Sequence, residues 1–272
     1  MLEKKLIVTA DDFGLTQGIN EGIIDAHRRG IVTRTSIIAN GEAFEHAVLL
    51  SKKHKDLKVG VHLTLVAESP INQPDKIKSL IGSNNKFLIN YKAFLGRYIL
   101  RKISLNEVYI EWESQIQKVL NSGIGINHID SHQHLHMLPG LFNNAVDLAY
   151  KYKINKIRML HQDIIRIRSF KELVLTFLSG MNKKRMEYSG LSYPDKLLGL
   201  KHSGNIDENN ILKLLCNIEN GTTEMMCHPG YADSAYYQKY NNWNYKPEEE
   251  LKALVSDRVK ERLKSSNIKL IS

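Results

Sequence analysis

Residues 6–14 read Leu-Ile-Val-Thr-Ala-Asp-Asp-Phe-Gly, a short apolar run followed at once by two carboxylates and a glycine. The run at 6–8 is typical of a buried strand, and a helix with isoleucines at positions 19, 23 and 24 on one face follows from about Thr16. A strand that leads into a helix is the repeating unit of parallel α/β proteins. The stretch therefore predicts a β–α unit with polar side chains where the strand ends.

The same alternation continues to the end of the chain. Further strands are predicted at 35–39, 58–65, 127–130, 156–160, 198–202, 222–227 and 268–271. Helices are predicted at 42–54, 104–123, from 139, at 170–178 with Gly180 as the stop, at 211–218 and from 247. About seven or eight β units indicate a parallel α/β barrel in a single domain, 1–272, with residues 66–103 as an insertion that forms a lid or binding wall.

Composition excludes several classes of protein. The chain has 272 residues, of which 42% are hydrophobic and 25% charged, as in ordinary globular proteins. The net charge of +9 is spread thinly, without a basic tail, so we expect no nucleic-acid partner. The sequence contains neither a signal peptide nor an apolar stretch of about 20 residues, which predicts a cytoplasmic protein without a transmembrane segment.

Asp and His side chains follow four of the predicted strands. Asp11 and Asp12 follow the first strand, His62 interrupts a later one, and His228 follows the strand at 222–227. Each has an ordinary explanation: an aspartate that caps a helix, a histidine packed in the core, or a histidine in a turn. Catalytic side chains of parallel barrels, however, come from the carboxyl ends of the strands, and here several such ends supply Asp or His.

The fourth cluster is the run His-Ile-Asp-Ser-His-Gln-His-Leu-His-Met at 128–137, which holds four of the eleven histidines. On an extended segment alternate residues share a face, so His128, Asp130, His132, His134 and His136 are expected to project together. Imidazole nitrogen is a good ligand for Zn, Mn, Co, Ni and Fe. We therefore expect part of this run to bind a metal.

The four clusters together supply a metal site of Asp and His with one Asp and one His left over. A metal ion polarises a carbonyl and lowers the pKa of its bound water. The spare carboxylate can then remove the proton of the water, and the spare imidazolium can donate a proton to the leaving group. This chemistry hydrolyses an amide or an ester. The sequence has no Gly-x-Ser-x-Gly elbow and no phosphate-binding Gly-x-x-x-x-Gly-Lys loop.

Four motifs, TADDFG at 9–14, GVHLTL at 60–65, HIDSHQHLHM at 128–137 and CHPGY at 227–231, occur in this order and resemble the YdjC-like carbohydrate deacetylases of the ChbG and HpnK type. The resemblance implies a distorted (β/α) TIM-like barrel of the NodB/YdjC deacetylase type. It also implies a metal-dependent hydrolase that removes an acetyl group from an N-acetylated sugar, such as a chitooligosaccharide or a related amino-sugar glycan.

The resemblance assigns roles to individual residues. It makes Asp12, His62 and His132 the metal ligands. Asp11 is then the general base and His228 the candidate general acid. Four further residues are expected to support these side chains or to contact the substrate: Asp130, His134, His136 and Tyr231.

The metal and the substrate stay open at this point. The resemblance implies Mg²⁺, whereas the softness of two imidazoles favours Zn²⁺ as the physical alternative. The substrate is expected to be an N-acetylated oligosaccharide or a glycolipid, and residues 66–103 and 161–197 are expected to determine which. A phosphoesterase with the same Asp and His residues, and a metal-dependent carbohydrate-binding protein without turnover, are the competing functions. An exposed barrel face is compatible with a homodimer.

Overall fold

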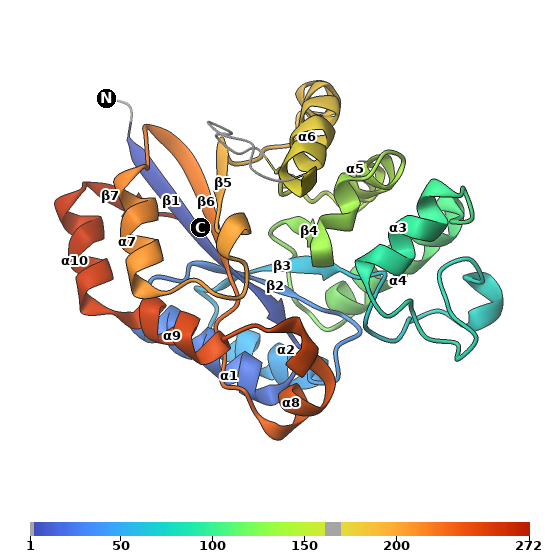
Figure 1. Cartoon of the computed structure of the whole chain (residues 1–272), viewed down its shortest axis with the longest axis horizontal. Helices are drawn as coiled ribbons and strands as arrows, with labels where there is room; N and C mark the ends of the chain where they lie inside the picture. Colours follow the sequence, from blue (N-terminus) through green and yellow to red (C-terminus); the bar gives the residue numbers. More distant parts are fainter. Residues whose placement is uncertain (1–2, 161–169) are drawn as a thin grey trace.

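The computed structural model describes residues 3–160 and 170–272. Its sheet contains seven parallel strands: β1 Lys4–Phe13, β2 Arg34–Ile37, β3 Lys58–Leu63, β4 Ile129–Ser131, β5 Lys196–Leu198, β6 Gly221–Cys227 and β7 Ile268–Leu270. The strands lie in the order β4-β3-β2-β1-β6-β5, and β7 also pairs with β1. The long strand β1 is therefore the centre of the sheet (Figure 1).

Residues 156–158 join the two edges of this sheet. Ile157 forms a parallel bridge with Ile129 of β4, and Lys156 forms one with Ser192, a few residues before β5. The strand predicted at 156–160 is thus reduced to isolated bridges, because only a few of its backbone groups meet a neighbour. The sheet closes through these bridges into a distorted α/β barrel, which confirms the predicted fold class.

Helices and short 3₁₀ turns surround the barrel (Figure 1). The α-helices are α1 Gln17–Arg29, α2 Phe44–Lys53, α3 Tyr91–Ile99, α4 Leu105–Asn121, α5 Leu141–Lys151, α6 Phe170–Ser189, α7 Glu208–Cys216, α8 Ser234–Tyr240, α9 Pro247–Val255 and α10 Asp257–Ser265. The 3₁₀ turns are η1 Pro74–Lys76, η2 His132–Met137, η3 Leu200–His202 and η4 Asn241–Trp243. None of the helices within the described ranges is long and apolar enough to cross a membrane.

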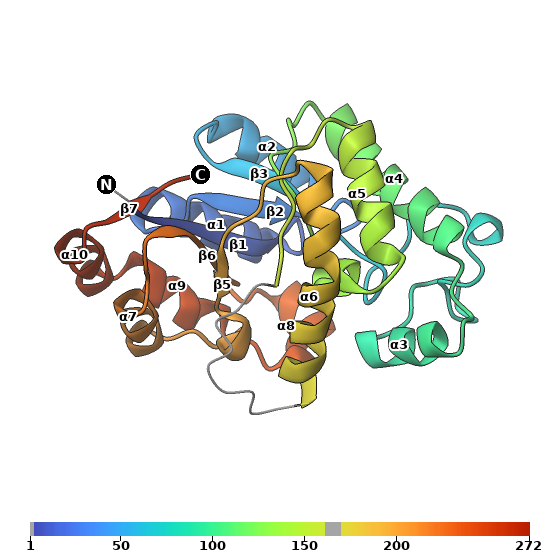
Figure 2. The ribbon, with the colours of Figure 1, turned by 90° about the horizontal axis from the view of Figure 1, so that it is seen from above.

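Local signals explain where several helices begin. The Thr16 side chain accepts the N–H of Ile19 and caps α1, and the Ser104 side chain accepts the N–H of Glu107 at the start of α4. The carboxylate of Glu107 does not complete a capping box, since it accepts the N–H of Ser79 in the insertion. This bond ties residues 66–103 to α4, while α3 lies at the periphery, away from the strands (Figure 2).

Some predicted boundaries were wrong. Helix α6 continues through Gly180 to Ser189, because an isolated glycine weakens a helix without ending it. Strand β5 precedes the predicted segment, and a 3₁₀ turn occupies most of 198–202. Helices α8 and α10 were not predicted. Part of the segment 161–197, namely 161–169, lies outside the described residues.

The inner face of the barrel is polar, unlike the apolar layer between the strands and the helices. Ser36, His62, Asp130, Arg158 and Glu224 are all buried. Side chains alternate between the two faces of a strand, so residues two positions apart share the interior. A buried polar interior requires that its groups satisfy one another. This requirement determines the arrangement of the site.

Candidate functional site

Asp12, His62 and His132 meet at the carboxyl end of the barrel. The Oδ1 atom of Asp12 lies 3.5 Å from His62 Nε2 and 3.3 Å from His132 Nδ1. All three residues are buried, and their ligand atoms lie within 4.8 Å of one another. Asp12 Oδ1 accepts no hydrogen bond from the described residues. An unpaired carboxylate oxygen between two imidazole nitrogens fits a divalent metal ion.

A β-bulge aims the two neighbouring carboxylates. The pairing of β1 with β2 shifts register between Ala10 and Phe13, and Asp12 has a φ of 69°. Such a bulge re-aims side chains that an ordinary strand would point to opposite faces. Both carboxylates are consequently buried at the site, where Asp12 faces the histidines and Asp11 faces Arg158.

Asp130 orients the His62 ring. Its Oδ1 lies 2.7 Å from His62 Nδ1, so the opposite nitrogen, Nε2, points toward Asp12. Burial alone would lower the pKa of His62, but the negative charge of Asp130 and its hydrogen bond raise it to about 9. A carboxylate behind a histidine is the usual support of a metal-binding imidazole. Asp130 therefore lies beneath the site, away from the pocket.

The electrostatics of Asp12 follow from the same neighbours. Burial would raise the pKa of its carboxyl, yet the neighbouring imidazole of His132, together with the charges of His62 and His228, holds this pKa well below its ordinary value. The carboxylate is thus ionised at neutral pH. The His132 ring packs against the indole of Trp243, with 4.9 Å between ring centroids, which fixes the plane of the imidazole.

Arg158 is the residue that the sequence analysis missed. Its guanidinium donates to both oxygens of Asp11, at 2.6 and 2.8 Å, and contacts Asp130 and Glu224 at 2.9 and 2.8 Å. Burial opposes its charge, but the three carboxylates outweigh that cost and keep the pKa of Arg158 above its ordinary value. The sequence did contain a signal for Arg158, because it is a charged residue within a strand that was predicted to be buried. The same signal was available for Glu224.

The histidine run does not form one face, contrary to the prediction. The extended segment ends at Ser131, and Gln133 and His134 both have a φ of 56° inside the turn η2. His134 lines the pocket, whereas His136 is fully buried and its ring nitrogens bind Ser131 Oγ and the carbonyl of Arg158. His128 lies four residues before His132, and it lines a different cavity, which it shares with Arg34 and Lys156.

His228 follows β6 and lines the same pocket as Asp11. Its Nδ1 atom is buried without a hydrogen-bond partner in the described structure, and its ring packs against Tyr245. Tyr231 does not face the pocket, since its hydroxyl donates to Asp25 on α1. The loop that follows β6 and carries His228 packs closely on α1. A Cβ atom on Gly22 of α1 would lie only 2.4 Å from the Cα of Gly230 in this loop, so only glycine fits there.

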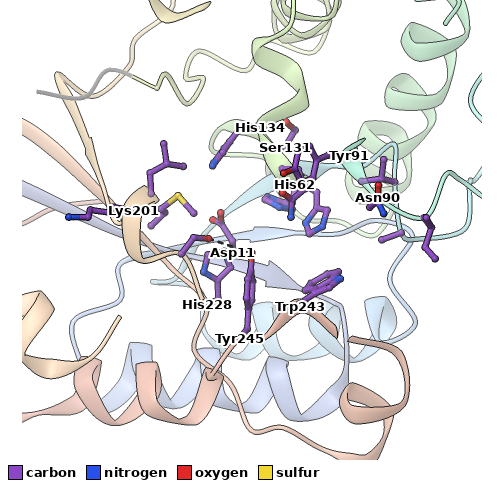
Figure 3. Close-up of a pocket in the computed structure, with 18 residues that line it drawn as sticks. Asp11, His62, Asn90, Tyr91, Ser131, His134, Lys201, His228, Trp243 and Tyr245 are labelled. Carbon is purple, nitrogen blue, oxygen red and sulfur yellow. Dashed lines mark hydrogen bonds between the residues drawn. The ribbon is translucent and has the colours of Figure 1, made fainter. Parts of the chain in front are cut away.

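The pocket above the site has a volume of about 420 Å³ (Figure 3). Trp243 and Tyr245 form one wall, and the insertion contributes Asn90 and Tyr91 to another. Lys201 also lines it. Aromatic walls with a few polar groups are typical of a site for a small polar ligand. The aromatic wall was not predicted, because Trp243 and Tyr245 lie in and just after the turn η4, outside every motif.

Comparisons with known proteins agree with this geometry. A sequence profile of the family described as YdjC-like protein matches residues 5–265. A carbohydrate deacetylase of Clostridium beijerinckii is 31% identical over 98% of both chains. One of Halalkalibacterium halodurans is 34% identical over 86% of this chain and 88% of its own. A solved structure from Enterococcus faecalis, whose name refers to cellobiose-phosphate cleavage, is 30% identical with a TM-score of 0.82, covering 99% of this chain and 97% of that one.

Proposed function

Because this chain belongs to the YdjC-like protein family, we propose that it is a metal-dependent hydrolase that removes the acetyl group from an N-acetylated sugar. The observation that carries this proposal is the joint placement of two unlike sets of groups around one pocket. Asp12, His62 and His132 form a metal-binding set, while Asp11 and His228 lie beside it with no part in that set. Relatives named carbohydrate deacetylase, similar over nearly the whole chain, supply the reaction class.

The metal-binding set would consist of Asp12 Oδ1, His62 Nε2 and His132 Nδ1. When bound, a divalent ion would polarise the acetyl carbonyl and acidify a water molecule. We propose Mg²⁺ as the ion that the family resemblance implies, with Zn²⁺ as the alternative that two imidazole ligands favour. The orphaned oxygen of Asp12 supports either ion, since it offers a free anionic ligand.

Asp11 would accept the proton of the attacking water. Arg158 holds both of its oxygens and Ser36 donates a further hydrogen bond to Oδ1, so the carboxylate has a single orientation. A general base works only from within hydrogen-bonding reach of the proton that it removes. Arg158 thus acts as a positioning residue, because it determines where the Asp11 oxygens lie without itself facing the reacting atoms.

His228 would donate a proton to the leaving amine. It lies at the end of a different strand from Asp11, and its unpartnered Nδ1 shows that no protein group in the described ranges occupies that nitrogen. Base and acid on separate strand ends can approach a substrate from different directions. This separation matches amide hydrolysis, where one group activates water and the other protonates nitrogen.

The pocket supports a sugar as the group that carries the acetamide. The faces of Trp243, Tyr245 and Tyr91 offer apolar rings with polar edges, which suit a pyranose. Asn90 and Lys201 add polar contacts. We propose a chitooligosaccharide or a related amino-sugar glycan as the substrate. A cytoplasmic location, a single domain and a homodimer stay predictions.

The decisive experiment is an acetate-release screen on N-acetylglucosamine oligomers. The protein is first treated with a chelator and then supplied with Mg²⁺ or Zn²⁺. We expect acetate release that depends on added metal and is lost in His132→Ala. Phosphate release from a phosphoester without acetate release would point to the phosphoesterase. Saturable sugar binding without any product would point to a binding protein.

A further inference from the structure

Two walls of the catalytic pocket come from segments far apart in the chain. Trp243 and Tyr245 follow α8, whereas Asn90 and Tyr91 belong to the insertion (Figure 3). Glu68, near the start of the insertion, lies behind the residues that line the pocket, and its carboxylate reaches α8. One side chain outside the pocket therefore connects the segments that build these two walls.

The carboxylate of Glu68 is buried, and each of its oxygens has its own donor. Oε1 accepts the hydroxyl of Tyr240 at 2.7 Å, and Oε2 lies 2.9 Å from Nζ of Lys239. Glu68 is only 3% exposed. Burial and the negative charge of Glu68 raise the pKa of Tyr240, so the hydroxyl keeps its proton and donates it to the carboxylate. Unpairing either oxygen would leave a buried charge poorly satisfied, which holds α8 in place.

Tyr240 transmits this contact to the aromatic wall. Its ring is buried and lies 4.7 Å from the ring of Trp243, between centroids. The Trp243 indole packs in turn against Tyr245, with 5.6 Å between centroids, and against the imidazole of His132. Packed aromatic rings have preferred separations and tilts, so the position of each ring depends on its neighbours. The place of Trp243 in the pocket thus depends on where Tyr240 is held.

A strained turn aims Glu68 at α8. Ala67 has a φ of 68°, and the N–H of Glu68 donates to the carbonyl of Val66 at 2.8 Å, which is the pattern of the rare γ-turn. Val66 and Ala67 both line the pocket and are tied to Leu88, by a parallel bridge and by an N–H···O bond of 3.0 Å. Leu88 lies two residues before Asn90. Strain of this kind persists only where surrounding contacts hold it.

We propose that Glu68 is a positioning residue, which fixes the aromatic wall relative to the insertion wall and so preorganises the pocket for its ligand. The part of this inference that concerns a sugar rests on the proposed function. A ligand that meets aromatic faces already in place does not have to order them on binding. Loss of the Glu68 charge should therefore weaken ligand binding more than it slows the chemical step.

Fluorescence quenching by acrylamide tests the position of the wall without any substrate. The chain has two tryptophans, and Trp112 is fully buried, so quenching of the metal-free protein reports mainly on Trp243. The variant Trp243→Phe supplies the baseline of Trp112. Glu68→Gln should increase the quenching of Trp243 and shift its emission to longer wavelength. The matched control is Glu42→Gln, which removes an exposed carboxylate from the same Lys239 and should change neither signal.

Kinetics of acetate release test the consequence for the substrate. Glu68→Gln should raise KM about tenfold and leave kcat within about threefold of the wild-type value. The reason is that Asp11 is oriented by Arg158 and Ser36, which take no part in the contacts of Glu68. Tyr240→Phe keeps the ring but removes the hydroxyl, and it should shift quenching and KM in the same direction if Glu68→Gln does not fold.

Three results would overturn the proposal. The quenching of Trp243 could stay unchanged in both Glu68→Gln and Tyr240→Phe. Glu42→Gln could have the same effect as Glu68→Gln, which would reduce that effect to the charge of Lys239. Glu68→Gln could lower kcat at an unchanged KM. A wild-type protein that releases no acetate would count against the proposed function alone, because the quenching comparison still decides whether Glu68 positions Trp243.

Discussion

Replacing Asp130 with asparagine tests how the metal site is supported. Asp130 is fully buried, lies 2.7 Å from His62 Nδ1 and also contacts Arg158. Asparagine keeps the shape of the side chain and its acceptor oxygen but removes the negative charge. Charge-assisted hydrogen bonds to a ligating histidine raise its basicity, so the substitution should lower the intrinsic metal affinity about 10–100-fold.

The negative charge of Asp130 also raises the proton affinity of His62, so a proton competes with the metal for this imidazole. With a His62 pKa of about 9 in the metal-free protein, protons reduce the apparent metal affinity at pH 7 by roughly 100-fold. In Asp130→Asn the pKa should fall toward 6.5, which removes most of this competition. The two effects oppose each other at pH 7, and the full loss should emerge only near pH 9.

Metal titrations in chelator-buffered solution from pH 7 to 9 measure both effects. The wild-type affinity should rise about tenfold per pH unit, and that of Asp130→Asn should stay nearly flat. Glu224→Gln is the matched control, since it also removes a carboxylate from Arg158 but touches neither His62 nor the metal ligands. Parallel pH curves for wild type and Asp130→Asn, or an equal loss in Glu224→Gln, would refute the reasoning.

Three further predictions concern the same site. His132→Ala should lose bound metal by elemental analysis, whereas His134→Ala, which alters a neighbouring pocket residue outside the ligand cluster, should keep it; the reverse result would contradict the assignment. Asp11→Asn should keep the metal but lose about 10²–10⁴-fold in turnover, as measured by acetate release, and loss of metal instead would make Asp11 a ligand. In the chelated protein, the raised pKa of His62 stabilises the folded state below pH 6.5, and this contribution disappears as the pH rises through about 9. Urea unfolding should therefore show a fall of about 3 kcal/mol over that range, which His62→Gln should lack.

The amino-acid sequence by itself determined the fold class and most of the reactive groups. The apolar run at 6–8 and the predicted strand at 222–227, each with Asp or His at its end, were enough to predict strand ends that meet in space. The reason is geometric, since the carboxyl ends of parallel strands share one edge, so side chains far apart in the chain converge there. This geometry predicted that the Asp and His clusters would converge, and the family resemblance selected Asp12, His62 and His132 among them, which the structure brings together.

Only the tertiary structure decided which partner each group meets. Arg158 reaches Asp11 across 147 positions of the chain, through strand register that local sequence does not encode. The bulge at Asp12 brought two adjacent carboxylates to one site, although a regular strand would point them to opposite faces. The turn after Ser131 separated histidines that a regular strand would have aligned. Buried polar groups take partners according to distance and orientation in the folded barrel, and these depend on the packing of all strands together.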